Sequence, residues 1–359
     1  MGVLSSRDIG AAPADDELRK MLETKKAEIK VIGAGGGGGN TISRLMQVGI
    51  VGAETIAINT DAQDLLYTDA DIKILIGKEM TGGLGSGADP RIGEEAAKES
   101  KNEIKKIVEG ADLVFVTCGM GGGTGTGSLP VVAEIAKREG ALVVGIVTLP
   151  FSMEGRHRST NAKGGIEKLK KVVDTLIVIP NDKLLEIVPD VSIATAFKVA
   201  DEILVNAVKG ITEIITKPGL VNRDFADVRA IMRDGGIAMI GMGDSDSENR
   251  ALEAVERALN NPLLDVDING ASGALINVLG GSDMTIRDCQ KIVESVATRL
   301  SPDAKIIWGA QVSKDLDESI RTMLIITGVK SPHIFETDHE FTKEKKKEVE
   351  KMFGIDFLQ

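Results

Sequence analysis

Aromatic side chains are scarce in this chain, which has one tryptophan, one tyrosine and an aromatic content of 3% over 359 residues. Proteins that bind single-stranded nucleic acid stack bases on aromatic side chains along a basic groove. The formal net charge here is −11, opposite in sign to the basic surface that such proteins carry. We therefore exclude a general nucleic-acid-binding function.

Cysteine and histidine are also rare. The two cysteines, Cys118 and Cys289, and the three scattered histidines form no metal-ligand spacing and no disulfide framework. Long apolar segments are missing too: no run reaches the roughly 18 residues of a membrane-spanning helix, and the N-terminus lacks a signal-peptide core. We expect a cytoplasmic protein that does not insert into membranes and holds no metal ion with its own side chains.

Glycine, by contrast, is abundant, and it concentrates in short runs. Residues 121–127 contain five glycines and two threonines. An apolar run at 113–117 precedes them and a helical pattern at 128–138 follows. Glycines let backbone N–H groups approach a ligand, and a helix N-terminus adds partial positive charge. The arrangement of strand, glycine loop and helix therefore indicates a phosphate-binding site.

The remaining pattern of the first half alternates strands with helices. Strands are expected at 28–32, 55–58, 72–76, 113–117, 141–147 and 175–179, and helices at 41–47, 92–108, 128–138 and 159–173. Such alternation predicts a parallel sheet covered by helices on both faces. Two more glycine runs, 33–40 and 82–87, also follow strands, so all three runs fall at the carboxyl edge of the sheet, where ligands bind.

A long amphipathic segment, residues 192–216, follows this first domain. Its apolar residues keep helical spacing until Lys217, Pro218 and Gly219 end the pattern. A helix of this length spans roughly 37 Å and crosses a whole domain. Further strands and helices then predict a second, smaller α/β domain. The expected fold is a Rossmann-like α/β nucleotide-binding domain joined by a long central helix to this smaller α/β domain.

The expected organisation has five parts. They are a flexible N-terminal extension at 1–27, a nucleotide-binding domain at 28–191, the central helix at 192–216, an α/β domain at 217–330 and a charged tail at 331–359. The last residues, 353–358, are apolar for a chain end. They are a candidate peptide for binding a partner protein.

The residue pattern leaves two nucleotide classes open. Gly33, Gly35 and Gly38 match the dinucleotide fingerprint, which also needs an acidic residue near the end of the second strand. That strand ends at Asn59 and Asp61 lies slightly beyond it, so NAD remains an alternative. Three glycine loops on one edge suit a longer phosphate chain. Because no GxxxxGK[ST] motif occurs and the loops lack lysine, backbone amides, hydroxyl groups, helix dipoles and Mg²⁺ are expected to hold the phosphates.

At this point the chain resembles a known family. Residues 121–127 read as the signature of the tubulin/FtsZ family of polymerising GTPases, and the resemblance extends from about residue 29 to residue 328. Supporting matches are the loop at 35–40, Asn59-Thr60-Asp61, Gly83-Leu84-Gly85, Pro150-Phe151 with Glu154-Gly155 and Arg158, and Asn222 with Asp224-Phe225-Ala226-Asp227. Their order and spacing together are specific to this family.

The resemblance implies a set of GTP/GDP contacts. They are Gly36, Gly37, Gly38, Gly39, Asn40, Asn59, Gly85, Gly122, Gly123, Thr124, Gly125, Thr126, Glu154, Arg158, Phe197 and Asp201. Phe197 and Asp201 are expected at the base, because a carboxylate accepts hydrogen bonds from the N1–H and 2-amino groups of guanine, which adenine cannot supply. The alternatives are core packing for Phe197 and an exposed helix carboxylate for Asp201.

The candidate catalytic residues are Asp224 and Asp227, with Asn222 beside them. Asp224 alternatively caps the following helix. Fifteen residues of helix, about 22 Å, separate Asp201 from the end of the central helix, so Asp224 is expected to face away from the nucleotide that Asp201 holds. A head-to-tail contact that repeats into a filament would bring the two sites together. The resemblance likewise implies that Asn222, Asp224 and Asp227 complete the next subunit's active site.

We therefore expect a self-assembling, cytoplasmic GTPase that acts at the site of cell division. Its expected partners are further copies of itself and a division or membrane-tether protein that binds the tail. The alternatives are an NAD-dependent oxidoreductase and a structural protein that binds GTP without hydrolysis.

Overall fold

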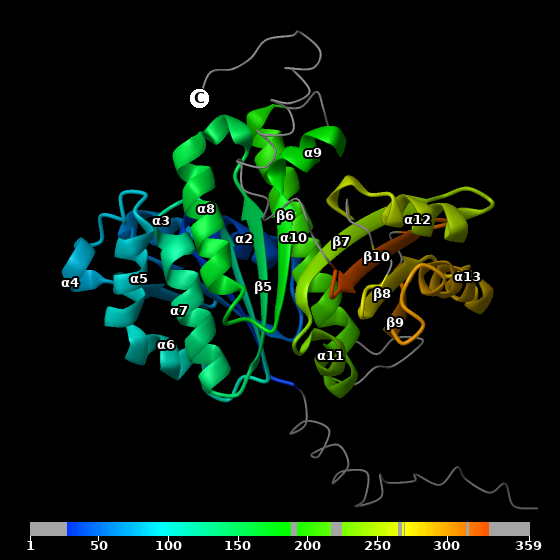
Figure 1. The fold of residues 1–359 in the computed structure, drawn as a ribbon, viewed down its shortest axis with the longest axis horizontal. Coiled ribbons are helices and arrows are strands. Elements are labelled where there is room, and N and C mark those ends of the chain that lie inside the picture. Colours follow the sequence, from blue (N-terminus) through cyan, green and yellow to red (C-terminus); the bar gives the residue numbers. More distant parts are fainter. Residues whose placement is uncertain are drawn as a thin grey trace, which may run out of the picture.

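A computed structural model describes residues 27–187, 192–216, 225–264, 268, 270–313 and 316–329. The expected tail at 331–359, all but one residue of the N-terminal extension at 1–27, and both Asn222 and Asp224 lie outside these residues. One ten-stranded sheet runs through the molecule in the order β3-β2-β1-β4-β5-β6-β7-β10-β8-β9, with helices on its faces (Figure 1).

The strands are β1 (Ile29–Ala34), β2 (Ala53–Asn59), β3 (Ile72–Leu75), β4 (Leu113–Gly119), β5 (Leu142–Leu149), β6 (Thr175–Pro180), β7 (Gly236–Ser245), β8 (Gly273–Gly280), β9 (Lys305–Val312) and β10 (Ile320–Thr327). The helices are α2 (Gly35–Val48), α3 (Ala62–Tyr67), α4 (Lys78–Thr81), α5 (Pro90–Glu99), α6 (Lys101–Val108), α7 (Thr124–Arg138), α8 (Arg156–Leu169), α9 (Asn181–Ile187), α10 (Ile193–Thr216), α11 (Phe225–Met232), α12 (Arg250–Leu259) and α13 (Ile286–Ala297), with short 3-10 turns at Ser152–Glu154 and Pro262–Leu264.

Strands β1 to β6 pair in parallel, which confirms the predicted α/β architecture. Most of their residues are apolar and buried, except in β3 at the edge of the sheet; in β4, the first six residues are all buried. Strands covered by helices on both sides read as continuous apolar runs. This is why the runs at 113–117 and 141–147 were recognisable in the sequence.

The second half of the chain extends the same sheet instead of forming one of its own. Strand β7 pairs in parallel with β6 through three residue pairs, from Thr175↔Gly236 to Ile177↔Ala238. Beyond it β10 runs antiparallel to both β7 and β8, and β9 lies parallel to β8. The sheet is therefore parallel in its first part and mixed in its second.

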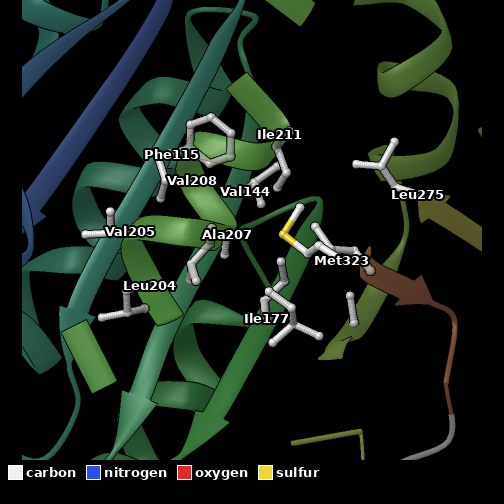
Figure 2. Close-up of a cluster of buried hydrophobic side chains, with 14 of the residues drawn as sticks. Phe115, Val144, Ile177, Leu204, Val205, Ala207, Val208, Ile211, Leu275 and Met323 are labelled. Atoms are coloured by element: carbon white, nitrogen blue, oxygen red, sulfur yellow. The ribbon is translucent and has the colours of Figure 1, made fainter. Parts of the chain in front are cut away.

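Helix α10 belongs to the core of both halves. Figure 2 shows Leu204, Ala207, Val208 and Ile211 of α10 among Phe115, Val144 and Ile177 of the parallel strands, with Leu275 and Met323 of the second half close by. All of these side chains are at most 3% exposed. Burying aliphatic side chains this completely contributes about 1.5–3 kcal/mol each. The central helix thus fixes the two halves relative to each other.

Several predicted helix boundaries were wrong. The first helix begins at Gly35, inside the glycine run, and not at residue 41. The single helix expected at 92–108 is two helices, α5 and α6, which meet at Ser100. Ser100 leaves helical geometry (φ −90°, ψ 18°), and its hydroxyl accepts a hydrogen bond from the backbone N–H of Gly77 (3.2 Å). Apolar spacing continues across the break, so periodicity alone did not reveal it.

No helix in the described part of the chain combines the length and apolarity needed to span a membrane.

Candidate nucleotide-binding site

A cleft of ≈ 460 Å³ opens at the carboxyl ends of the parallel strands. Eleven of the predicted nucleotide contacts line it, and they come from four separate segments. They are Gly36, Gly37, Asn40, Gly122, Gly123, Thr124, Gly125, Glu154, Arg158, Phe197 and Asp201. Segments far apart in the sequence therefore meet where the glycine runs predicted a ligand.

Two helix N-termini converge on this cleft. Helices α2 and α7 have Ala34 and Gly123 at their N-cap positions. Neither residue has a polar side chain that can satisfy the first backbone N–H groups, which leaves these donors available to an anion. The helices approach so closely that a Cβ on Gly35 would lie 2.9 Å from the backbone nitrogen of Gly125. Glycine is required at Gly35 for a second reason, because its φ is +69°.

Hydroxyl groups connect the glycine runs at 82–87 and 121–127 beside the cleft. The Oγ1 atom of Thr124 lies 2.6 Å from Oγ1 of Thr60 and 2.9 Å from Oγ of Ser86. Ser86 and Thr124 both line the cleft and are at most 9% exposed. Hydroxyl groups next to unsatisfied backbone amides add donors for phosphate oxygens.

Glu154 and Arg158 form one wall of the cleft. Arg158 Nη1 lies 2.5 Å from Glu154 Oε2, and Glu154 Oε1 accepts a hydrogen bond from the backbone N–H of Phe151 (2.9 Å). This second bond fixes the carboxylate, which in turn orients the guanidinium group. The pair places one positive and one negative group on this wall of the cleft.

The α10 side of the cleft carries Phe197 and Asp201. The Phe197 ring is 41% exposed and meets the Phe151 ring edge to face at 5.1 Å, so the core-packing alternative for Phe197 was wrong. Asp201 is half-buried, and its Oδ1 accepts a hydrogen bond from Thr41 Oγ1 at 3.5 Å. Burial raises the pKa of the Asp201 carboxyl from 3.8 to about 6; the Thr41 bond opposes the rise and the charge of Glu202 adds to it.

Five predicted contacts do not line the cleft and instead support its loops. Gly38 and Gly39 allow α2 to pack closely: a Cβ on Gly38 would lie 2.8 Å from Thr117 O, and one on Gly39 would lie 3.0 Å from Thr68 Oγ1. Asn59 donates to Asp64 Oδ2 (2.6 Å), Thr126 Oγ1 accepts from Gly121 N (2.9 Å), and Gly85 N donates to Thr60 O (3.1 Å).

Sequence reasoning missed Asn181, Thr148 and Ser86, which also line the cleft. Asn181 is 4% exposed, and within the described residues its Oδ1 has no hydrogen-bond partner. A buried, unpartnered oxygen at a cleft wall is costly unless a ligand or water donates to it. The available signal was its position, since Asn181 directly follows strand β6 at the same carboxyl edge.

The one candidate catalytic residue that the structure describes, Asp227, does not line this cleft. Asp227 is in the first turn of α11, beyond the far end of α10. That end reaches the loop before β2, where Thr216 Oγ1 donates to Val51 O (3.3 Å). Since α10 has 24 residues, its ends are about 36 Å apart. Figure 1 shows α11 at the opposite end of the molecule from α9, whose first residue lines the cleft.

The acidic residue considered for an NAD ribose has another role. Asp61 Oδ1 accepts hydrogen bonds from the backbone N–H groups of Gln63 (2.9 Å) and Asp64 (3.1 Å). Asp61 therefore caps α3, as acidic residues at N-cap positions do. The structure gives the dinucleotide alternative no ribose-binding carboxylate at this position.

Comparisons with known proteins agree with this geometry. A model described as "Tubulin/FtsZ family, GTPase domain" matches residues 28–189, and one described as "FtsZ family, C-terminal domain" matches residues 236–330. The protein called Cell division protein FtsZ 1 from Thermococcus kodakarensis is 62% identical over 326 residues, which cover 91% of this chain and 87% of the relative. The protein of the same name from Pyrococcus abyssi is 61% identical over 334 residues, which cover 93% of this chain and 89% of the relative.

A solved structure shares the fold as well. The empty FtsZ dimer of M. jannaschii superposes with a TM-score of 0.85 at 57% identity, covering 91% of this chain and 99% of that one. These matches span most of the chain and include the strands, the cleft and α10. They do not favour the NAD-dependent alternative. The chain therefore belongs to the tubulin/FtsZ family and is a GTP-binding GTPase of the FtsZ type.

Proposed function

We propose that the cleft binds GTP with its phosphates against the N-termini of α2 and α7 and its base against α10. The observation that carries this orientation is the position of Asp201, a half-buried carboxylate on the same cleft as two uncapped helix N-termini. In this orientation Glu154 and Arg158 contact the ribose and neighbouring phosphate. Phe197 stacks on the base, and Asn181 Oδ1 gains a donor from it.

Hydrolysis is proposed to need a second copy of the chain. Phosphoryl transfer to water requires a group that positions the water beside the terminal phosphate. Asn222, Asp224 and Asp227 supply that group in this proposal, and Asp227 lies past the end of α10 remote from the cleft. A cleft on one copy and carboxylates on another form a complete site only in a head-to-tail contact, which repeats into a filament.

Exposed apolar side chains support such a contact at both ends. Leu84 is 88% exposed and lies in the loop that contributes Ser86 to the cleft, and Tyr67 is 80% exposed at the end of α3. Val51, 63% exposed, lies at the other end beside Thr216. Large exposed apolar groups mark interaction surfaces when they gather near a functional site. The M. jannaschii protein is described as a dimer.

Mg²⁺ is proposed to enter with the nucleotide. Among the described residues, no group of three or more histidine, cysteine, aspartate or glutamate side chains is arranged to hold a metal ion. This fits Mg²⁺, which keeps several waters and binds chiefly through substrate phosphates. The hydroxyl groups of Thr124 and Ser86 and the amide of Asn40 are the cleft groups suited to its hydration shell. The ion would neutralise charge on the phosphates.

In the cell, we infer a role as a filament-forming protein at the division site, from the division proteins to which the chain is similar. The tail at 331–359 is proposed to bind a division or tether protein.

The basic test is nucleotide identity and turnover. Protein purified without added nucleotide is denatured and its released nucleotide identified; we expect GDP or GTP and no NAD. Phosphate release is then measured with GTP and with ATP at equal concentration, and we expect release from GTP alone. Bound NAD, or equal turnover of ATP, would contradict the proposal. Tight GTP binding with no phosphate release at any protein concentration would favour the non-hydrolysing structural alternative.

A further inference from the structure

The loop at residues 82–89 is held against the cleft from two sides. On the cleft side, Ser86 Oγ lies 2.9 Å from Thr124 Oγ1. On the outer side, Asn161 of α8 donates from Nδ2 to the carbonyl oxygen of Ala88 (3.1 Å) and to that of Gly121 (3.3 Å). One amide group thus bridges the loop at 82–89 and the glycine run at 121–127. Asn161 itself does not line the nucleotide cleft.

Two hydrogen bonds hold the backbone at Ala88: Asp89 N donates to Ser86 O (3.0 Å) within the turn, and Asn161 donates to Ala88 O. The φ of Ala88 is +62°, in the left-handed region that alanine occupies only at a cost in free energy. The next residue, Asp89, begins α5 as its N-cap by accepting from Arg91 N (2.9 Å). The strained residue therefore lies between a helix that is fixed by packing and the serine that lines the cleft. Relaxation of Ala88 would displace Ser86.

The two loops also leave no room for movement toward each other. A Cβ on Gly123 would lie 2.3 Å from Ser86 Oγ and 2.7 Å from Asp89 N. This close approach limits movement of the loop at 82–89 toward Gly123, so the movement that Asn161 would oppose is outward, away from Gly123. The two N–H donors of a side-chain amide match the two carbonyl acceptors that resist this movement. Reversing the amide would place its oxygen against both carbonyls, so its orientation is fixed.

We propose that Asn161 is a positioning residue for GTP: it holds Ala88 in its left-handed conformation and thereby keeps the Ser86 hydroxyl in the cleft. This inference rests on the proposed orientation of GTP, with the phosphates beside Thr124. Asn161 acts through the loop and has no contact with the nucleotide. Its loss should weaken GTP binding while the chemical step in assembled protein, which depends on Asp224 and Asp227, changes little.

The test uses the full chain and a slowly hydrolysed GTP analogue in titration calorimetry. We expect Asn161→Ala to weaken analogue binding about tenfold, and kcat at saturating GTP to stay within about twofold of the wild type. Asn161→Asp keeps the shape of the side chain but replaces both donors with acceptor oxygens that face the two carbonyls, so it should give a loss at least as large. Thr160→Ala is the matched control, because the Thr160 hydroxyl donates within its own helix, to Arg156 O (3.0 Å), and has no other partner among the described residues.

A second substitution separates positioning from general destabilisation. Glycine adopts φ > 0 freely, so Ala88→Gly should remove most of the need for Asn161. In the Ala88→Gly background we expect Asn161→Ala to weaken binding by no more than about threefold, a non-additivity typical of residues in contact. Unchanged binding in Asn161→Ala and Asn161→Asp, or an equal loss in both backgrounds, would overturn the inference. If the wild type itself fails to bind the analogue, the proposed GTP site fails instead.

Discussion

The two ends of α10 differ in what they bring to the reaction. Its first turns carry Phe197 and Asp201 and complete a cleft with two helix N-termini. Its last residue, Thr216, leads toward the segment that contains Asp224 and Asp227. In the proposed account, the first end recognises and holds a nucleotide, and the carboxylates beyond the other end position water. Each chain would then carry two half-sites, so catalysis should require a second copy.

The largest expected effect comes from removing the carboxylates at the second end. Asp224→Ala and Asp227→Ala should each lower GTP turnover at least about 100-fold, because the attacking water loses its positioning group, while GTP affinity stays near the wild-type value. Turnover is measured by phosphate release and affinity by calorimetry. Glu248→Ala, which removes one exposed carboxylate elsewhere in the second half, is the control. Equal losses of affinity and turnover would place these residues in the nucleotide cleft of their own chain.

The next largest effect is expected from a substitution at the first end of α10. Asp201→Ala should weaken GTP binding about 10- to 100-fold, as expected when a charged acceptor of two hydrogen bonds is removed. Glu202→Ala is the matched control, since its exposed carboxylate pairs with Arg44 and does not line the cleft. At a GTP concentration that fills the wild-type cleft but leaves the Asp201→Ala cleft largely empty, each variant alone should be nearly inactive. Mixing Asp201→Ala with Asp224→Ala protein should then restore up to about a quarter of wild-type turnover, because some head-to-tail contacts combine two intact half-sites. A mixture as inactive as its components would contradict the two-half-site comparison.

A change in pH should have a smaller effect on GTP affinity. The raised pKa of Asp201, about 6, means that this carboxyl takes up a proton as the pH falls through that value, and the protonated form loses acceptor capacity for guanine. GTP affinity should fall about tenfold between pH 7 and pH 5. The stability of the fold should change in the opposite direction. Because the pKa of Asp201 is higher in the folded chain than its ordinary value, its contribution to stability is lost as the pH rises through about 6. Calorimetry at several pH values checks the binding, and the Asp201→Ala variant should have a flatter profile.

A substitution in the middle of α10 should lower stability without a selective effect on GTP affinity or on turnover. Ile211 is fully buried in the core that both halves share (Figure 2). Ile211→Ala should lower the free energy of unfolding by about 2–5 kcal/mol, while GTP affinity and turnover of the folded protein at 25 °C stay within about threefold of the wild type. Denaturant unfolding measures the first quantity. A selective loss of turnover without loss of stability would mean that α10 couples the two ends.

Local patterns predicted much of this structure. The central helix was expected at 192–216 and is found at Ile193–Thr216, because its apolar spacing is unbroken and Lys217-Pro218-Gly219 ends it. The parallel strands were visible as apolar runs, and the glycine runs located the cleft. These signals depend on residues close together in the sequence.

What the sequence did not reveal depends on contacts between distant residues. Three residue pairs join β6 to β7 and make one sheet of two halves, and no local pattern encodes them. The role of Asn181 depends on burial at the cleft wall, and that of Asn161 on two carbonyls from distant loops. Gly38 and Gly39 also allow close packing of α2, which composition did not reveal, and their predicted contact with phosphate stays a prediction. The contribution of Asn222 and Asp224 stays a prediction.

The most direct test of the two-half-site account is the rate of GTP hydrolysis per molecule as a function of protein concentration, with light scattering recorded on the same samples. The account predicts that specific activity is near zero in dilute protein and rises steeply over the concentration range in which scattering appears. A specific activity that stays constant from dilute to concentrated protein, whatever the scattering, would contradict it.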